Sequence, residues 1–460
     1  MTGKTLRVIR RLAALLVVAL LGLGLWLFAF PPQKLRVGDG YAAKIVCSNV
    51  FLAKRDAEEV LRLDVQAPGH PLLRLVGVEV ERERASVTAR FLGFLAPVEA
   101  VYRPGYGCAV APGDDPAAAR AEVSAMPALE QEATNGGSGS QGEMADGTSL
   151  DQGLQAILSD EALAGPQMRA IVVVKDGKIV GETYGDGFDR DTPLLGWSMA
   201  KTVNAAIIGR LMEEGRMHFS DRGLLPEWQG DERAEITLAE LMAMESGLEF
   251  NENYGDVSDV TRMLYLEPDM AGFAAQKPLE KTPGAEFRYS TGNSLLLSRI
   301  WMNRFADPSE ALAYPRQALF NPLGMESAVL EVDAHGTFVG GSYLYATARD
   351  WARFGQLLLQ DGIWNGTRLL PEEFMAAMRT PSAHSDGRYT QAQAWLTGPD
   401  GSRSEANGLP ADVFWAQGHD GQTMAIVPSQ NLVVVRLGLT PRKLGYRPQV
   451  LLKAVIDRLD

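Results

Sequence analysis

The sequence predicts an α/β (α+β) fold for its larger, C-terminal part: a mainly antiparallel sheet flanked by helices, with a helical subdomain. Two observations predict this class. Short runs of β-branched and apolar residues lie at both ends of residues 150–460, and segments with the period of amphipathic helices lie between them. Strands from both ends of a segment that enclose helices favour a sheet closed by its terminal strands.

The first strands of this part are predicted by AIVVVKDGKIVGETYG, in which Asp176-Gly177 separates two β-rich runs, as in a tight hairpin. A helix near 151–158 precedes them. The other predicted elements, in chain order, are helices at 198–214, 236–246 and 347–362, strands at 414–417, 424–428 and 432–437, and a last helix from about Pro448.

The first thirty residues differ in composition from the rest. Four basic residues, Lys4, Arg7, Arg10 and Arg11, precede an unbroken apolar run over 12–30. As a helix, this run is about 28 Å long, close to the hydrocarbon thickness of a bilayer. Because no small-residue cleavage site follows, we expect residues 1–32 to form an uncleaved single-pass anchor rather than a signal peptide. The basic residues place the rest of the chain on the extracytoplasmic (periplasmic) side of the cell membrane.

Residues 33–112 predict a small β-rich domain, because apolar and polar residues alternate at 76–83 and 87–91. Both cysteines, Cys47 and Cys108, lie here, and they can form a disulfide in an oxidising compartment; two buried free thiols are the alternative. This unit is a spacer, a packing partner or a recognition surface. Residues 113–149 are rich in Gly, Ser, Ala and acids and predict a flexible linker, with a transient helix at 116–132.

The net charge of −13 argues against a nucleic-acid partner, because binding phosphates needs a basic surface. The five histidines and two cysteines show no spacing typical of a metal site. The sequence also contains no glycine-rich phosphate or dinucleotide loop. We therefore expect neither a metal nor another cofactor.

The stretch LLGWSMAKTVNAAIIGRL places Ser198 and Lys201 three residues apart at the start of a predicted helix. Residues at i and i+3 share one helix face. A serine at a helix N-terminus has a free backbone N–H at the positive end of the helix dipole, which favours an oxyanion. A lysine in apolar surroundings can become neutral and act as a base. Alone, this motif is short enough to occur by chance.

Two later stretches extend the pattern. PGAEFRYSTGNSLLLS places Tyr289 in a turn before a helix, and FWAQGHDGQTMAIVP places His419 and Gly421 beside a strand. This order of motifs resembles the class C β-lactamase-related serine hydrolases of the β-lactamase and penicillin-binding-protein superfamily. Within them it is most similar to the esterase and 6-aminohexanoate-dimer hydrolase branch. The resemblance covers nearly all of 150–460 and includes ITLAELMAMESGLEF, NPLGM and GGSYLYATARDWARFGQLLLQDGIWNG.

The resemblance implies catalytic roles for three residues. Ser198 is similar to the acylated serine, Lys201 to its base, and Tyr289 to the tyrosine that passes a proton to the leaving group. Tyr254 is a further candidate for the substrate-binding site, because relatives carry a loop over the site there. An ordinary surface loop is the simpler interpretation of that segment.

The stretch with His419 and Gly421 is the third motif in chain order, after those of Ser198 and Tyr289. The resemblance implies that its glycine allows the substrate to lie against the strand. The backbone N–H of Gln422 would then complete the oxyanion hole together with that of the nucleophile. Three departures from the β-lactamase pattern are visible: Thr291 replaces an asparagine, His419 replaces a lysine, and Glu245 replaces a small hydroxyl residue. The first two argue against efficient β-lactam hydrolysis.

The sequence therefore predicts a membrane-anchored serine hydrolase that forms an acyl-enzyme on a small-molecule ester or amide. Two alternatives stay open. A Ser-His-Asp hydrolase is one, since Gly196-x-Ser198-x-Ala200 is close to a nucleophile elbow, although DTPLLGW is a poor strand. A catalytically inactive relative that binds an envelope peptide or protein is the other, although all the main catalytic side chains are present.

Overall fold

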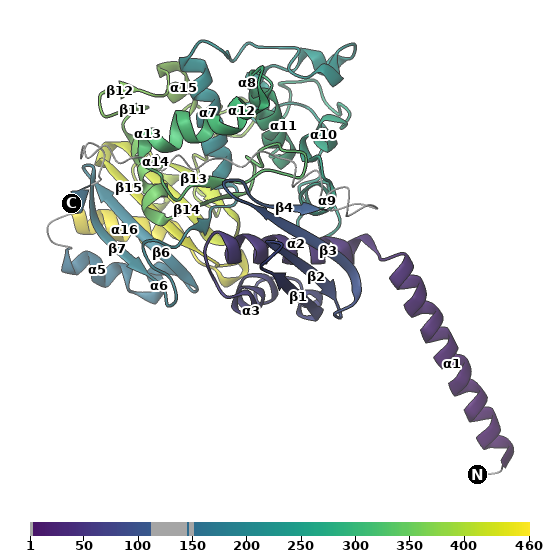
Figure 1. Ribbon diagram of the computed structural model, residues 1–460. Helices are drawn as coiled ribbons and strands as arrows, with labels where there is room; N and C mark the ends of the chain where they lie inside the picture. Colours follow the sequence, from purple (N-terminus) through teal and green to yellow (C-terminus); the bar gives the residue numbers. More distant parts are fainter. Residues whose placement is uncertain (1–2, 112–144, 147–150) are drawn as a thin grey trace.

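The computed structural model describes residues 3–111, 145–146 and 151–460 (Figure 1). Apart from 145–146, the linker predicted at 113–149 and its transient helix at 116–132 lie outside the described residues. The rest of the chain divides into a long first helix, a region at 33–111 that is partly helical, and the larger C-terminal part.

The C-terminal part is built on one six-stranded sheet in which the late strands pair with the first hairpin. The strand order is β13-β14-β15-β6-β7-β5, and only the short β5 runs parallel to its neighbour. The bounds are β13 Phe414–Gly418, β14 Gln422–Val427, β15 Leu432–Gly438, β6 Met168–Lys175, β7 Lys178–Tyr184 and β5 Ala145–Asp146. The predicted α/β fold is confirmed.

Helices cover both faces of this sheet. Ile171 and Val173 of β6 pack into a core shared with α5, α6 and α16, whereas Val172 and Val174 pack into the core on the α14 side. Alternate residues of a strand face opposite sides, so the centre of β6, residues 170–174, is apolar because neither side meets water there. The bounds of these helices are α5 Gln152–Leu158, α6 Glu161–Ala164, α14 Ala348–Leu359 and α16 Pro448–Leu459.

The helical subdomain lies between β7 and β13 in the chain and above the sheet in Figure 1. The first helix of the subdomain, α7, directly follows the strand β8, which belongs to a small three-stranded sheet of order β8-β10-β9. The helix predicted at 236–246 is shorter than expected, because Thr237 caps its start and Met244 takes a left-handed φ of 61°. The bounds are β8 Leu194–Leu195, β9 Val329–Leu330, β10 Leu344–Ala346, α7 Met199–Glu213, α8 Leu238–Met242, α9 Asp259–Leu266, α10 Met270–Ala275, α11 Thr291–Met302, α12 Pro308–Pro315, α13 Asn321–Leu323 and α15 Glu372–Ala377.

The first helix, α1 (Gly3–Ala29), extends away from the rest of the molecule (Figure 1). Its segment Arg10–Ala29 has a mean hydropathy of 2.6, and none of its most apolar stretch is buried. Within the part of the chain that the structure describes, it is the one helix long and apolar enough to span a membrane. Leu15, Leu25 and Phe28 are among its exposed side chains.

The region at 33–111 differs from the predicted β-rich domain because its first half is helical. Helix α2 (Gln33–Phe51) is buried almost continuously from Asp39 to Val50, so it lacks the single apolar stripe that marks a helix in a sequence. A four-stranded antiparallel sheet follows. The elements are α3 Ala57–Val60, η1 Leu61–Gln66, η2 Pro71–Leu75, β1 Val76–Glu81, β2 Ser86–Phe91, β3 Leu95–Arg103 and β4 Gly107–Ala111.

This region shares its core with the C-terminal part. Buried side chains of α2 and β2, such as Val46 and Val87, belong to the same apolar cluster as Leu264 of α9 and Leu295 of α11. No break in the core therefore marks the boundary predicted near residue 112. Of the roles considered for this region, the packing partner fits this continuity.

A buried ionic cluster ties α2 to the C-terminal part. Glu331 forms an ion pair with Lys44, and both side chains are almost completely buried. The carboxylate of Glu331 also accepts hydrogen bonds from the Ser48 hydroxyl, at 2.8 Å, and from the Cys108 backbone N–H, at 2.7 Å. Removing one partner of such a cluster leaves an uncompensated buried charge, so these contacts fix where α2 lies.

A disulfide joins Cys47 of α2 to Cys108 of β4. We expect the double variant Cys47→Ser, Cys108→Ser to lower the free energy of unfolding by about 2–4 kcal/mol, because the crosslink restricts the unfolded chain. Urea denaturation of both proteins, with and without reductant, measures this change. Reductant should lower the stability of the wild type and leave that of the double variant unchanged; equal stability of all four samples would contradict the prediction.

Candidate active site

Ser198 lies at the start of α7, after the strand β8. It is the N-cap residue of that helix, yet its side chain makes no capping hydrogen bond. N-cap serines normally accept a backbone N–H from the first turn. Here the hydroxyl oxygen instead accepts a hydrogen bond from the Lys201 amine at 3.1 Å. The preceding residue, Trp197, has a φ of 50°, an unfavourable conformation for a bulky side chain that is typical of functional sites.

Lys201 is buried one helical turn below Ser198, with 1% of its surface exposed. Its amine also donates to the Thr291 hydroxyl at 3.0 Å and to the Gly341 carbonyl at 2.7 Å, and it lies 5.0 Å from the centre of the Tyr289 ring. Burial lowers the pKa of Lys201 to about 8, although the negative charge of Glu252 opposes this shift. A substantial fraction of this lysine is therefore neutral near physiological pH.

Tyr289 lies in the turn that precedes α11, and its ring packs against those of Tyr389 and Trp395. Burial and the charge of Glu252 raise the pKa of Tyr289 above its ordinary value, while a hydrogen bond with Ser198 opposes the rise. The side chain is therefore a neutral phenol beside Ser198, able to donate a proton.

Glu252, which sequence reasoning did not select, organises this side of the site. Its carboxylate accepts the Thr291 backbone N–H at 2.8 Å and also binds the Thr291 hydroxyl. The Tyr254 hydroxyl donates to the same carboxylate at 3.1 Å. Thr291 thus links Glu252 to Lys201, at the position where the β-lactamase pattern has an asparagine. A single acid in the loop segment NENYGD carries no motif that could have revealed this role.

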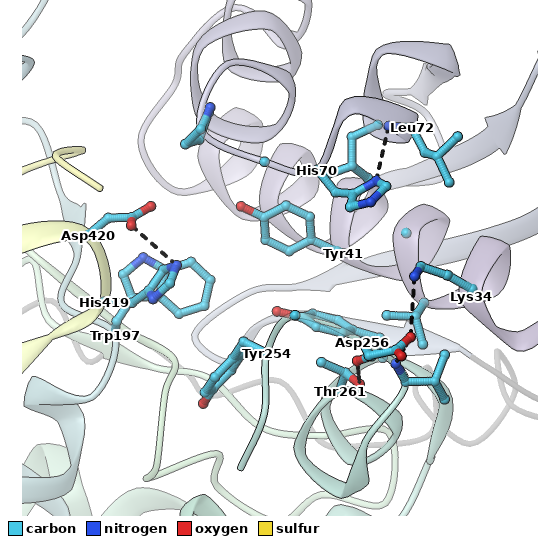
Figure 2. A pocket seen from close by; sticks show the side chains of 18 of the residues that line it. Lys34, Tyr41, His70, Leu72, Trp197, Tyr254, Asp256, Thr261, His419 and Asp420 are labelled. Carbon is cyan, nitrogen blue, oxygen red and sulfur yellow. Dashed lines mark hydrogen bonds and ion pairs between the residues drawn. The ribbon is translucent and has the colours of Figure 1, made fainter. Parts of the chain in front are cut away.

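Tyr254 and His419 lie together on the rim of the site (Figure 2). Their rings are stacked with centres 5.9 Å apart, and the His419 ring meets that of Trp197 edge-on at 5.6 Å. The imidazole also faces the Asp420 carboxylate at 3.4 Å. Tyr254 thus lines the cavity, and so does Trp197.

Two residues of the third motif do not have the expected place. Gln422 lies on β14, one strand in from the edge, and its side chain bonds the backbone of Gly438 and the His419 carbonyl. Gly421 adopts a φ of 86° in the turn, where a Cβ would meet the Arg436 side chain rather than a substrate. Neither residue lines the cavity. Their contacts serve the β13–β14 turn, and their roles in oxyanion and substrate binding stay predictions.

The end of β13 lies directly against the backbone before the nucleophile. A Cβ on Gly418 would come within 2.1 Å of the Gly196 carbonyl oxygen, so only glycine permits this contact. Gly418 and His419 line the cavity together with Ser198. Glu245 does not line it; its carboxylate accepts the His384 backbone N–H at 2.8 Å.

These side chains border a cavity of about 870 Å³. Ser198 and Tyr289 line it, and so do Lys34 of α2 and Asp256, which form an ion pair at 3.3 Å (Figure 2). The volume is in the upper range of pockets that bind small molecules. Within the described residues, no group of three or more His, Cys, Asp or Glu side chains could hold a metal ion. A serine hydroxyl in contact with a buried amine and a neutral phenol is an arrangement suited to acyl transfer.

This fold and this site define a serine hydrolase. Residues 161–445 match the Beta-lactamase family, and the chain belongs to that family. It is 26% identical, over 301 residues, to the 6-aminohexanoate-dimer hydrolase of Paenarthrobacter ureafaciens, with 59% of this chain and 72% of that one covered. The resemblance found in the sequence is thereby confirmed.

Solved structures share the same fold. A penicillin-binding protein homologue from Caulobacter crescentus matches 66% of this chain and 96% of its own with a TM-score of 0.52, at 14% identity. EstCE1, a hydrolase with promiscuous acyltransferase activity, matches 66% and 97% with a TM-score of 0.52, at 16% identity. The family match begins at residue 161, so it does not include the region at 33–111.

The pKa of Lys201 gives the site a defined pH dependence. The base must be neutral, so we expect kcat/KM for p-nitrophenyl acetate to rise with pH and reach half its plateau at a pH of about 8. Because Glu252 raises the pKa of Lys201, Glu252→Gln should move this midpoint to lower pH. Glu249→Gln, which removes an exposed charge from the same loop, is the control. An unchanged or higher midpoint in Glu252→Gln would contradict the prediction.

Proposed function

We propose that the protein is a membrane-anchored serine hydrolase that cleaves a small-molecule ester or amide through an acyl-enzyme on Ser198. The observation that carries this proposal is the hydroxyl of Ser198 at the mouth of α7, in contact with a buried lysine and a neutral phenol. In this reaction Lys201 is the base and Tyr289 the proton donor to the leaving group.

The reaction begins when neutral Lys201 takes the proton of the Ser198 hydroxyl as its oxygen attacks the substrate carbonyl. The negative charge that develops on the carbonyl oxygen lies at the positive end of α7, where the Ser198 N–H is available to donate. The second hydrogen bond to this carbonyl oxygen is donated from the end of β13, where Gly418 and His419 border the cavity. Tyr289 gives its proton to the departing alcohol or amine and regains one from the protonated lysine.

A water molecule then repeats the sequence in the opposite direction. It loses a proton to Lys201, attacks the acyl carbonyl and releases the acid, while Ser198 regains its proton. Thr291 and Glu252 take no part in bond breaking. Thr291 holds the lysine in place by accepting a hydrogen bond from its amine, and the charge of Glu252 raises the pKa of the lysine.

Esters and small or linear amides fit this site better than β-lactams. The third motif offers His419, which faces Asp420 and stacks on Tyr254, in place of a lysine that would bind a β-lactam carboxylate. Thr291 holds its hydroxyl toward Lys201 and Glu252 instead of presenting an amide to the substrate. Serine acyl transfer itself needs neither of the missing groups.

The membrane attachment rests on α1, whose length and composition suit a bilayer. The basic residues before its apolar segment favour an extracytoplasmic, periplasmic position for the catalytic part. The disulfide between Cys47 and Cys108 supports the same side, because such bonds persist in oxidising compartments.

The acyl-enzyme can be tested directly. On mixing with p-nitrophenyl acetate, the intact mass of the protein should increase by one acetyl group, and Ser198→Ala should show neither this increase nor turnover. Lys201→Met should lower kcat/KM by roughly 10²–10⁴-fold, the usual contribution of a general base. Lys178→Met, which removes an exposed lysine from β7, should keep full activity.

Turnover that survives in Ser198→Ala would contradict the proposal. Loss of activity in Ser198→Ala but not in Lys201→Met would favour a Ser-His-Asp hydrolase. Absence of acylation in the wild type with esters, linear amides and β-lactams would favour the inactive, binding relative.

A further inference from the structure

One wall of the catalytic cavity is apolar and comes from outside the region that matches the family. It is formed by Leu35 and Val37 of α2, Leu72 and Leu73 of η2, and Phe91 at the end of β2. We call these five residues the apolar wall. The wall borders the same cavity as Ser198 and Tyr289, so a substrate bound at the nucleophile also meets it.

The apolar wall continues onto the outer surface. Leu72 lines the cavity and is nevertheless 39% exposed. Leu75, Leu92 and Phe94 are 45%, 50% and 56% exposed. The Leu92 N–H donates to the Leu75 carbonyl at 2.7 Å, which places the β2–β3 turn beside η2. Apolar surface therefore extends from the nucleophile's cavity to the exterior.

This surface lies where α1 joins the rest of the molecule. Only three residues, at 30–32, separate α1 from α2, a span of at most about 14 Å. Lys34 and Leu35, in the first turn of α2, already line the cavity, and β3 contacts α1. Figure 1 shows α1 leaving the rest of the molecule beside α2 and the β2–β3 end of the four-stranded sheet β1-β2-β3-β4. If α1 spans a bilayer, the rim of the cavity lies at the membrane surface.

We infer that the substrate is an amphiphile, an ester or amide whose long apolar chain lies along the apolar wall and which reaches Ser198 from the membrane surface. This inference rests on the proposed function. A short, polar substrate would leave the wall uncovered in water. Each methylene of a chain buried against it favours binding by roughly fourfold.

Polar groups at the rim suit the other end of such a molecule. Lys34, His70 and Asp256 surround the opening, and the His70 ring accepts the Leu72 backbone N–H at 3.2 Å (Figure 2). An amphiphile presents polar atoms at the bilayer surface and its chain below them. The arrangement of a polar rim beside an apolar wall matches that order.

The chain-length preference tests the substrate class. The full-length protein in lipid vesicles is given p-nitrophenyl esters with acyl chains of four to ten carbons. We expect kcat/KM to rise by at least about tenfold across the series. Leu72→Asp should lower the ratio of long-chain to short-chain kcat/KM by at least about tenfold, whereas Val450→Asp, an equally exposed apolar position on α16, should leave the ratio unchanged. A flat series in the wild type, or equal ratios in the two variants with unaltered thermal unfolding, would overturn the inference.

The route from the membrane is tested by where the substrate is placed. A water-insoluble long-chain ester is incorporated either in the vesicles that contain the protein or in separate, protein-free vesicles. Hydrolysis at least tenfold faster in the first case is expected; equal rates would overturn membrane entry. Turnover of the four-carbon ester that depends on Ser198 shows that the proposed function holds even when either result is negative. Without that turnover, the proposed function fails and the inference fails with it.

Discussion

The burial of one lysine amine among uncharged acceptors is the constraint on which the site depends. All three protons of a charged Lys201 have acceptors: the hydroxyls of Ser198 and Thr291 and the carbonyl of Gly341. The hydrogen bonds are satisfied, so burial acts mainly on the charge. Two helices also begin beside this amine, α7 just after Ser198 and α11 at Thr291. The positive ends of these two helices disfavour a positive charge on the Lys201 amine.

Glu252 balances these effects. A carboxylate at the start of α11 is favourable for that helix, and its charge keeps the pKa of Lys201 from falling further. The fold thus holds the amine near the point where it exchanges protons with the serine. The same carboxylate positions Tyr254, which in turn stacks on His419. One loop residue therefore couples Lys201 to the rim of the cavity.

The region before the family domain belongs to the site. Its helix α2 is held by the buried pair of Lys44 and Glu331 and by the disulfide to β4, and its core is continuous with that of the helical subdomain. Because it is fixed in this way, its side chains can form a defined wall of the cavity. The segment that follows α1 thus also lines the cavity of the candidate site.

The sequence by itself determined the class of the fold, the hairpin at Asp176-Gly177, the membrane-length helix and the pattern of Ser198, Lys201 and Tyr289. The strands, the hairpin and the long helix depend on local periodicity, and the pair Ser198–Lys201 on spacing within one helical turn, which a sequence displays directly. The role of Tyr289 is implied by the resemblance to the family. Helix α2 was missed because a helix buried on nearly all sides has no apolar stripe.

Only the tertiary structure decided the partners that come from distant segments. Glu252 meets Thr291 through a loop whose course no motif predicts. The sequence predicts Gln422 for the oxyanion hole because it follows the third motif, but in the folded chain Gln422 lies on β14, while Gly418 and His419 line the cavity. Which residues of a turn face a site depends on strand pairing across the sheet, and that pairing is a property of the folded chain.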